Sequence, residues 1–255
     1  MSLYRRLFID TSRINLSLNQ GLLINLLPNE IHYLSRVIRL RTKELFEVTD
    51  GEGGLWIASF ETPKQIKLQK RLTSKPLLQS KRTLIGIAVA IPKQDFDYII
   101  RMSCEIGIDL IQPLLSKRGV VKQESKERRS RWNSILRESV EQSERLWMPK
   151  ICDTKEYIDW ISSYKSPSNI AIGISRIDKS LDFSSWMNSL EVDVEVIWIA
   201  IGPEGGWSPE EIKLAKESGC GQVQFGDFIM RTSTAAVVAS HIMASWRTNE
   251  LRNVI

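Results

Sequence analysis

The sequence predicts an α/β fold in which short buried strands alternate with helices. Three observations predict it: an apolar run at residues 194–201 before a glycine-rich loop, a second strand and polar loop at 222–234, and strand-helix alternation from residue 84 onward. Apolar, β-branched runs of this length are typical of strands that are buried on both faces of a parallel sheet. The alternation favours a mostly parallel sheet with helices on both faces.

The first part of the chain is expected to be mostly β. Residues 45–49 and 55–60 are strand-like and flank a glycine-rich turn at 50–54, and residues 66–69 alternate apolar and polar side chains. This pattern predicts a small barrel. A polar stretch with a proline at 74–81 separates it from the next pattern, so we expect one domain at residues 1–76 and a second at 77–255.

In the second part, strands are predicted at 84–90, 110–115 and 170–174, and a helix begins near Phe96. A long helix follows the second of these strands, and Glu141 is expected off its buried face. The side chains expected on that face are Trp132, Ile135, Leu136, Ser139, Val140 and Ser143.

Two polar, glycine-bearing loops predict a ligand site. In the first, at 201–211, Ser208 is expected to cap a helix, with Pro209 at the first helical position and Glu211 completing a capping box. The second loop leads into an apolar helix at 235–246, which should be buried or packed on a partner. Loops at the carboxyl ends of strands carry the binding sites of open α/β sheets. Each loop taken alone is also compatible with a rigid turn that binds nothing.

Composition and charge narrow the function. The three cysteines are widely spaced, no stretch has the length of a membrane span, and the first residues lack the apolar core of a signal peptide, so we expect a cytoplasmic protein without a metal site. The formal charge is +5 overall, with +5 in residues 1–76, +5 in 117–150 and −5 in 151–255. Two separate basic regions favour a partner that carries phosphates, although solvated charged helices would give the same pattern.

Four motifs in order resemble the RsmE family of ribosomal RNA methyltransferases, within the SPOUT superfamily. The two loops, at 201–206 and 225–235, resemble its S-adenosylmethionine site, and residues 32–51 are similar to its PUA-like N-terminal domain. Residues 96–114 resemble its Lys-x-x-Glu-Leu-Gly segment, and residues 141–145, Glu-Gln-Ser-Glu-Arg, match its Glu-Gln-Ser/Cys-x-Arg element.

The resemblance implies a PUA-like β-barrel followed by a SPOUT-type α/β trefoil-knot domain, a homodimer, and methyl transfer to N3 of a uridine in 16S ribosomal RNA. Arg231 and Arg145 are the catalytic candidates, because a guanidinium stays charged and can stabilise a uracil anion. The RNA contacts are assigned to Arg5, Arg6, Arg36 and Arg39. The residues assigned to the cofactor are Gly173, Ile201, Gly202, Pro203, Glu204, Gly205, Gly206, Phe225, Gly226, Ile229, Met230, Arg231, Thr232, Thr234 and Ala235.

Two departures from the family pattern leave alternatives open. Ser233 stands where the family usually has a glutamate, and Phe228 stands where it usually has an arginine. Another SPOUT activity, ribose 2′-O-methylation, would use the same loops, and a non-catalytic ribosome-binding factor could lack that carboxylate. Glu204 is a candidate base, although a loop carboxylate bonded to backbone amides is the alternative. No Gly-x-Gly-x-x-Gly opens a βαβ unit, which argues against a dinucleotide oxidoreductase.

Overall fold

The computed structural model describes residues 5–18, 21–73, 83–164, 168–175, 181–190 and 194–253. The chain divides into two compact units, the first formed by residues 1–81 with 137–148 and the second by residues 82–136 with 149–255. The stretch at 74–81, where we placed the domain boundary, lies outside the described residues. The segment 137–148, which contains the end of α4 (Lys126–Gln142), belongs to the first unit.

The first unit contains a five-stranded sheet in the order β1-β3-β4-β5-β2. Its strands are β1 (Arg6–Phe8), β2 (Leu23–Asn25), β3 (Leu45–Thr49), β4 (Leu55–Thr62) and β5 (Gln65–Arg71), and its helices are α1 (Thr11–Leu18), α2 (Pro28–His32) and the π-helix η1 (Tyr33–Val37). The three predicted strands are confirmed, whereas α1 was not predicted. Alternate side chains of the strands, including Phe46, Val48 and Ile66, are buried in its core.

The second unit is built on a parallel sheet in the order β11-β13-β10-β12-β6-β7-β8, with β9 paired to β7. Its strands are β6 (Leu84–Ala90), β7 (Leu110–Leu115), β8 (Lys150–Ile151), β9 (Lys155–Glu156), β10 (Ile170–Gly173), β11 (Leu181–Asp182), β12 (Val196–Ile201) and β13 (Gly221–Gln224). Its helices are the first part of α4 and α3 (Phe96–Ile106), α5 (Tyr157–Ser162), α6 (Phe183–Asn188), α7 (Pro209–Glu217) and α8 (Thr232–Asn253). The predicted α/β fold is confirmed, and α8 begins three residues before its predicted start.

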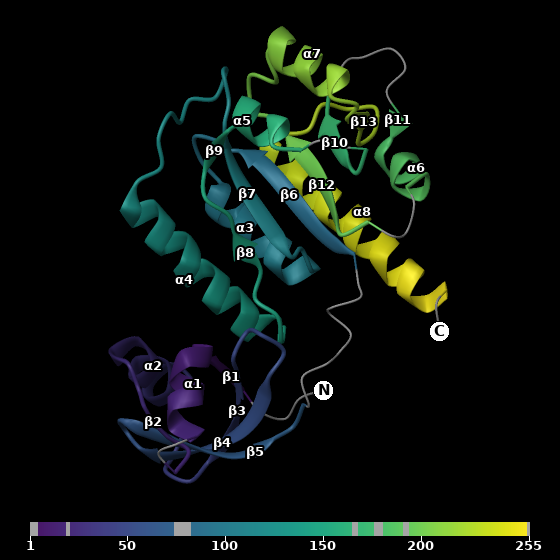
Figure 1. Ribbon diagram of the computed structural model, residues 1–255. Coiled ribbons are helices and arrows are strands. Elements are labelled where there is room, and N and C mark those ends of the chain that lie inside the picture. The colour runs from purple at the N-terminus through teal and green to yellow at the C-terminus, as the bar shows by residue number, and fades with distance from the viewer. Residues whose placement is uncertain are drawn as a thin grey trace. The chain divides into compact units, whose positions relative to one another are not determined.

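Helices cover both faces of this sheet. Alternate strand residues such as Ala88, Ile172 and Trp198 face a core that includes Tyr157 and Trp160 of α5. The other face packs against α8, which contacts β6, β12 and α3; Figure 1 shows α8, in yellow, running along β6 and β12. Burial on both faces explains why these strands are continuously apolar.

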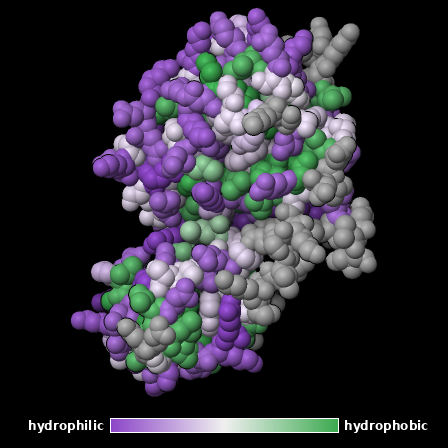
Figure 2. All heavy atoms as spheres, in the orientation of Figure 1, coloured by the Kyte–Doolittle hydropathy of each residue, from purple (hydrophilic) through white to green (hydrophobic). Residues whose placement is uncertain are grey.

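The surface mixes polar and apolar side chains. Hydrophilic residues cover much of the face seen in Figure 2, with smaller groups of hydrophobic residues among them. Within the described part of the chain, no helix combines the length and apolar composition needed to cross a membrane.

Candidate active site

Three neighbouring strands of the second unit end at one edge of the sheet. β13, β10 and β12 are adjacent and parallel, so their carboxyl ends at Gln224, Gly173 and Ile201 lie together. The loops that leave β12 and β13 are the two predicted ligand loops. The fold therefore brings together the two loops that the sequence placed about twenty residues apart.

The start of α7 has the predicted capping geometry. Ser208 Oγ accepts a hydrogen bond from the Glu211 N–H at 3.2 Å, and Glu211 Oε2 accepts one from the Ser208 N–H at 2.7 Å. Pro209 is the first residue of the helix. The capping box fixes where the β12 loop ends, which limits the loop to a short span.

Two further hydrogen bonds hold the ligand loops. Thr232 Oγ1 donates to the Gly202 carbonyl at 2.9 Å, which joins the start of α8 to the β12 loop. Trp207 Nε1 donates to the Gly173 carbonyl at 3.1 Å, which joins the β12 loop to the end of β10. Both donor side chains are buried, so these hydrogen bonds are shielded from competition with water.

The backbone at two glycines leaves room for a bound group. Gly206 and Gly226 have φ angles of +67° and +129°, and a Cβ atom placed on either would meet nothing within 4 Å. Such φ angles are open to glycine at little cost. A backbone without side chains beside open space lets a nucleoside-type cofactor approach closely, so the residues present fit the predicted ligand.

The predicted cofactor residues differ in exposure. Ile201, Pro203, Thr232 and Ala235 are buried; Gly173, Gly202, Gly206, Phe225 and Met230 are half-buried; Glu204, Gly205, Gly226, Ile229, Arg231 and Thr234 are exposed. The buried residues anchor the loops, and the exposed ones are accessible to ligands. Phe228, with 87% of its surface exposed, lies in the same loop as Arg231.

The Glu204 carboxylate has a structural partner. Its Oε1 accepts a hydrogen bond from the Lys93 backbone N–H at 3.2 Å, in the loop that follows β6. This contact favours the alternative reading of Glu204, a loop carboxylate bonded to backbone, over a catalytic base.

The second catalytic candidate, Arg145, lies in the first unit. Its Nε donates to the Trp147 carbonyl at 3.1 Å. The segment around it is attached to the first unit by hydrogen bonds from the Gly53 N–H to the Leu146 carbonyl and from the Met148 N–H to the Gly51 carbonyl, both at 2.8 Å. Arg145 and Arg231 therefore belong to different units.

Glu141 has a partner that the sequence did not predict. It is not among the α4 side chains of the predicted buried face, but its carboxylate accepts a hydrogen bond from the Phe8 N–H of β1 at 2.9 Å. Burial raises the pKa of Glu141 to about 7, and the Phe8 hydrogen bond lowers it only in part. Helical spacing could not find this contact, because the partner strand is more than 130 residues away in the chain.

The four arginines assigned to RNA do not share one environment. Arg5, Arg36 and Arg39 are exposed. Arg6 is buried, with its Nε and Nη2 bound to the Glu47 carboxylate and its Nη1 bound to the Glu144 carbonyl. We correct the prediction for Arg6: its guanidinium holds the first unit together and does not face a phosphate.

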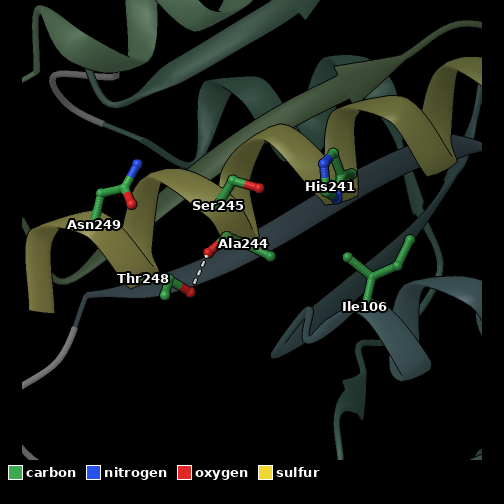
Figure 3. A pocket seen from close by; sticks show the side chains of 6 residues that line it. All are labelled: Ile106, His241, Ala244, Ser245, Thr248 and Asn249. Carbon is green, nitrogen blue, oxygen red and sulfur yellow. Dashed lines mark hydrogen bonds between the residues drawn. The ribbon is translucent and has the colours of Figure 1, made fainter. Parts of the chain in front are cut away.

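A shallow pocket lies between the end of α3 and the later turns of α8, and none of its lining residues belongs to the ligand loops. Its lining residues are Ile106, His241, Ala244, Ser245, Thr248 and Asn249 (Figure 3). Thr248 Oγ1 donates to the Ala244 carbonyl of its own helix at 2.9 Å. In the described residues, no cluster of three or more His, Cys, Asp or Glu side chains offers a metal site.

Comparisons with known proteins agree on one family. The model of the RNA methyltransferase domain matches residues 79–244. Ribosomal RNA small subunit methyltransferase E of Synechocystis sp. is 31% identical over 223 residues, which cover 85% of this chain and 71% of that protein. The protein of the same name from Rickettsia conorii is 27% identical, with 83% and 84% covered. A crystal structure of ribosomal RNA small subunit methyltransferase E from Neisseria gonorrhoeae bound to S-adenosyl methionine is 25% identical, with a TM-score of 0.79, and covers 95% of this chain and 97% of that one.

Proposed function

This chain belongs to the ribosomal RNA small subunit methyltransferase E family, and we propose that its methyl acceptor is N3 of one uridine in small-subunit ribosomal RNA. The activity is S-adenosylmethionine-dependent methyl transfer to 16S ribosomal RNA. The observation that carries the assignment of the site is the joining of two ligand loops, at the ends of β12 and β13, by the Thr232–Gly202 hydrogen bond.

S-adenosylmethionine supplies a methyl group that its sulfonium already activates. The work left to the protein is to place the acceptor in line and to help remove the N3 proton, and positioning alone can lower such a barrier greatly. The backbone of residues 201–206 and 225–235 would hold the cofactor, and buried Thr232 and Trp207 would keep both loops in place.

Arg231 is the residue that we assign to the uracil anion. It is exposed, and it directly precedes α8 on the loop that Thr232 joins to Gly202. A guanidinium can donate two parallel hydrogen bonds to the uracil oxygens and stabilise the charge that appears when N3 loses its proton. Arg145 remains the second candidate, and its assignment stands on the resemblance.

The first unit is proposed to bind RNA as a PUA-like domain. Arg5, Arg36 and Arg39 expose positive charge there, which suits sequence-independent contacts with phosphates. A trefoil knot in the second unit is proposed from the family alone.

We also propose a homodimer, with a revised surface. The small apolar residues of α8 that suggested it, including Ala236, Ala239 and Met243, are buried in their own unit. We assign the dimer surface instead to the pocket beside α8 in Figure 3 together with Tyr98 and Met102 of α3, which are 58% and 41% exposed. Light scattering at micromolar concentration tests this proposal. A wild-type dimer that Met102→Glu weakens would support the surface, and a monomeric wild-type protein would refute the dimer.

The test of the catalytic assignment is single-turnover methylation of ribosomal RNA with saturating cofactor. Arg231→Ala should slow the reaction by roughly a hundredfold, the size of effect seen when one charge-stabilising donor is removed. Calorimetry should show nearly unchanged S-adenosylmethionine binding. Equal methylation rates for Arg231→Ala and the wild type would refute the role, whereas a wild-type protein that binds cofactor without turnover would refute the activity.

A further inference from the structure

The loop at 116–122 places a basic sequence, Ser-Lys-Arg-Gly-Val-Val-Lys, beside the ligand loops. It follows β7, and β7 neighbours β6, which neighbours β12. Because these strands are parallel, the 116–122 loop lies at the same edge of the sheet as the β12 loop. It approaches from the β6 side, whereas β10 and β13 lie on the other side of β12.

Arg118 is held against the β12 loop at Gly205. Its Nη1 donates to the Gly205 carbonyl at 3.3 Å, and a Cβ atom on Gly205 would lie 3.5 Å from the Arg118 Cβ. A second attachment fixes the neighbouring backbone, because the Lys117 N–H donates to Glu211 Oε1 at 2.9 Å. The Arg118 side chain is thus directed to the loop that we assign to the methyl donor.

The nearby carboxylates already have partners. Glu210 pairs with the Lys117 Nζ at 3.3 Å, Glu211 is engaged in the capping box, and Glu204 accepts from Lys93. Among the residues that the structure describes, no carboxylate forms an ion pair with Arg118, whose side chain is exposed. One of its five N–H donors is directed to Gly205, and within the described part of the chain the others are available to an anion.

We propose that Arg118 binds a phosphate of the substrate RNA next to the nucleotide that accepts the methyl group, a role that rests on the proposed function. An arginine fork matches two oxygens of one phosphate, and such charge-assisted pairs are stronger than neutral hydrogen bonds. The Gly205 carbonyl keeps the fork at the rim of the donor site. Arg118 is therefore a positioning residue that couples RNA binding to the cofactor loop. It takes no part in the methyl transfer step itself.

The test compares Arg118→Ala, Arg118→Lys and the control Lys216→Ala, which removes one exposed positive charge from the last turn of α7. Binding to small-subunit ribosomal RNA is measured across a salt series, and cofactor binding by calorimetry. Arg118→Ala should weaken RNA binding roughly tenfold or more. It should reduce the slope of log affinity against log salt by about 0.7 to 0.9, the value for one lost phosphate contact.

The variants separate this role from others. Arg118→Lys should restore the salt slope and recover only part of the affinity, since it keeps the charge and loses the fork. The control Lys216→Ala should bind RNA as the wild type does. All of the variants should bind S-adenosylmethionine with the wild-type affinity. If Arg118→Ala kept the wild-type slope of log RNA affinity against log salt, the proposal would be overturned. A loss of affinity for the cofactor alone would also overturn it, because Arg118 would then support the cofactor loop or bind the carboxylate of the cofactor. If the wild-type protein bound RNA and did not methylate it, the proposed function would fail while the salt slope still tested Arg118.

Discussion

Thr232 Oγ1 lies 2.9 Å from the carbonyl oxygen of Gly202, so the first residue of α8 holds the loop that follows β12. Thr232 is only 6% exposed, and a buried hydrogen bond of this kind is costly to leave half-made. The two ligand loops therefore keep one relative position before a ligand arrives, which reduces the entropy lost on binding.

Replacing Thr232 tests this hydrogen bond. Thr232→Val keeps the shape and removes the donor, so calorimetry should show S-adenosylmethionine affinity reduced by roughly tenfold, the equivalent of about 1–2 kcal/mol. Thr232→Ser keeps the hydroxyl and should bind close to the wild type. Equal affinities in the valine and serine variants would show that the hydrogen bond does not organise the site.

Glu141 should make stability depend on pH. The pKa of Glu141 is raised from 4.5 to about 7, mainly by burial and in part by Glu138 and Glu30, while the Phe8 hydrogen bond and Arg137 act to lower it. Between these values the folded state holds a proton that the unfolded state has released, so the stability conferred by the neutral carboxyl is present below about pH 4.5 and is lost as the pH rises through about 7.

The variant for this prediction is Glu141→Gln, which cannot ionise. Relative to the wild type, it should gain roughly 3 kcal/mol in free energy of unfolding between about pH 5 and about pH 8. Urea unfolding followed by circular dichroism at the two pH values measures the gain. Glu52→Gln, which removes an exposed carboxylate of the first unit that does not act on the pKa of Glu141, is the matched control; a similar gain in both variants would refute the assignment to Glu141.

Arg6 and Arg36 should behave in opposite ways. Arg6→Met removes the guanidinium that pairs with the buried Glu47 carboxylate and should lower the free energy of unfolding by roughly 3–5 kcal/mol. Arg36→Ala removes an exposed charge, so it should leave stability nearly unchanged and reduce the salt dependence of RNA binding. Thermal unfolding and RNA titrations distinguish the two variants. If Arg6→Met were as stable as the wild type, the buried structural role of Arg6 would be contradicted.

Gly86 should not tolerate a side chain. It pairs in register with Trp198 across β6 and β12, and a Cβ atom on Gly86 would lie 2.5 Å from two atoms of the Trp198 ring. Gly86→Ala should therefore cost roughly 1–3 kcal/mol of stability, the usual penalty for overpacking. The penalty should shrink when Trp198→Leu is introduced as well, and an equal penalty in both backgrounds would show that the ring is not the cause.

Local signals predicted much of the second unit. The β6, β7 and β12 runs are apolar because both faces of the strands are buried, and Ser208, Pro209 and Glu211 specify the start of α7 within four residues of chain. Such features need only nearby sequence. The same is true of the glycines in the ligand loops, whose positive φ angles at Gly206 and Gly226 explain why glycine stands there.

Contacts between distant segments could not be predicted in this way. The burial of Arg6 depends on Glu47 and on Glu144, and the burial of Glu141 depends on β1. The charge of Arg6 suggested a surface residue, as an isolated arginine usually is. Arg118 lies in the basic region 117–150 that the sequence analysis identifies, but its contact with Gly205 could not be predicted, because it exists only once β7 and β12 lie in one sheet.

We propose that this protein transfers a methyl group to N3 of a uridine in small-subunit ribosomal RNA. The most direct measurement incubates the purified protein with isotope-labelled S-adenosylmethionine and small ribosomal subunits from a strain that lacks this activity, followed by mass spectrometry of the RNA nucleosides. We expect labelled 3-methyluridine with the wild type and a greatly reduced amount with Arg231→Ala. Label on a ribose 2′-oxygen, or no labelled nucleoside from a protein that binds the cofactor, would contradict it.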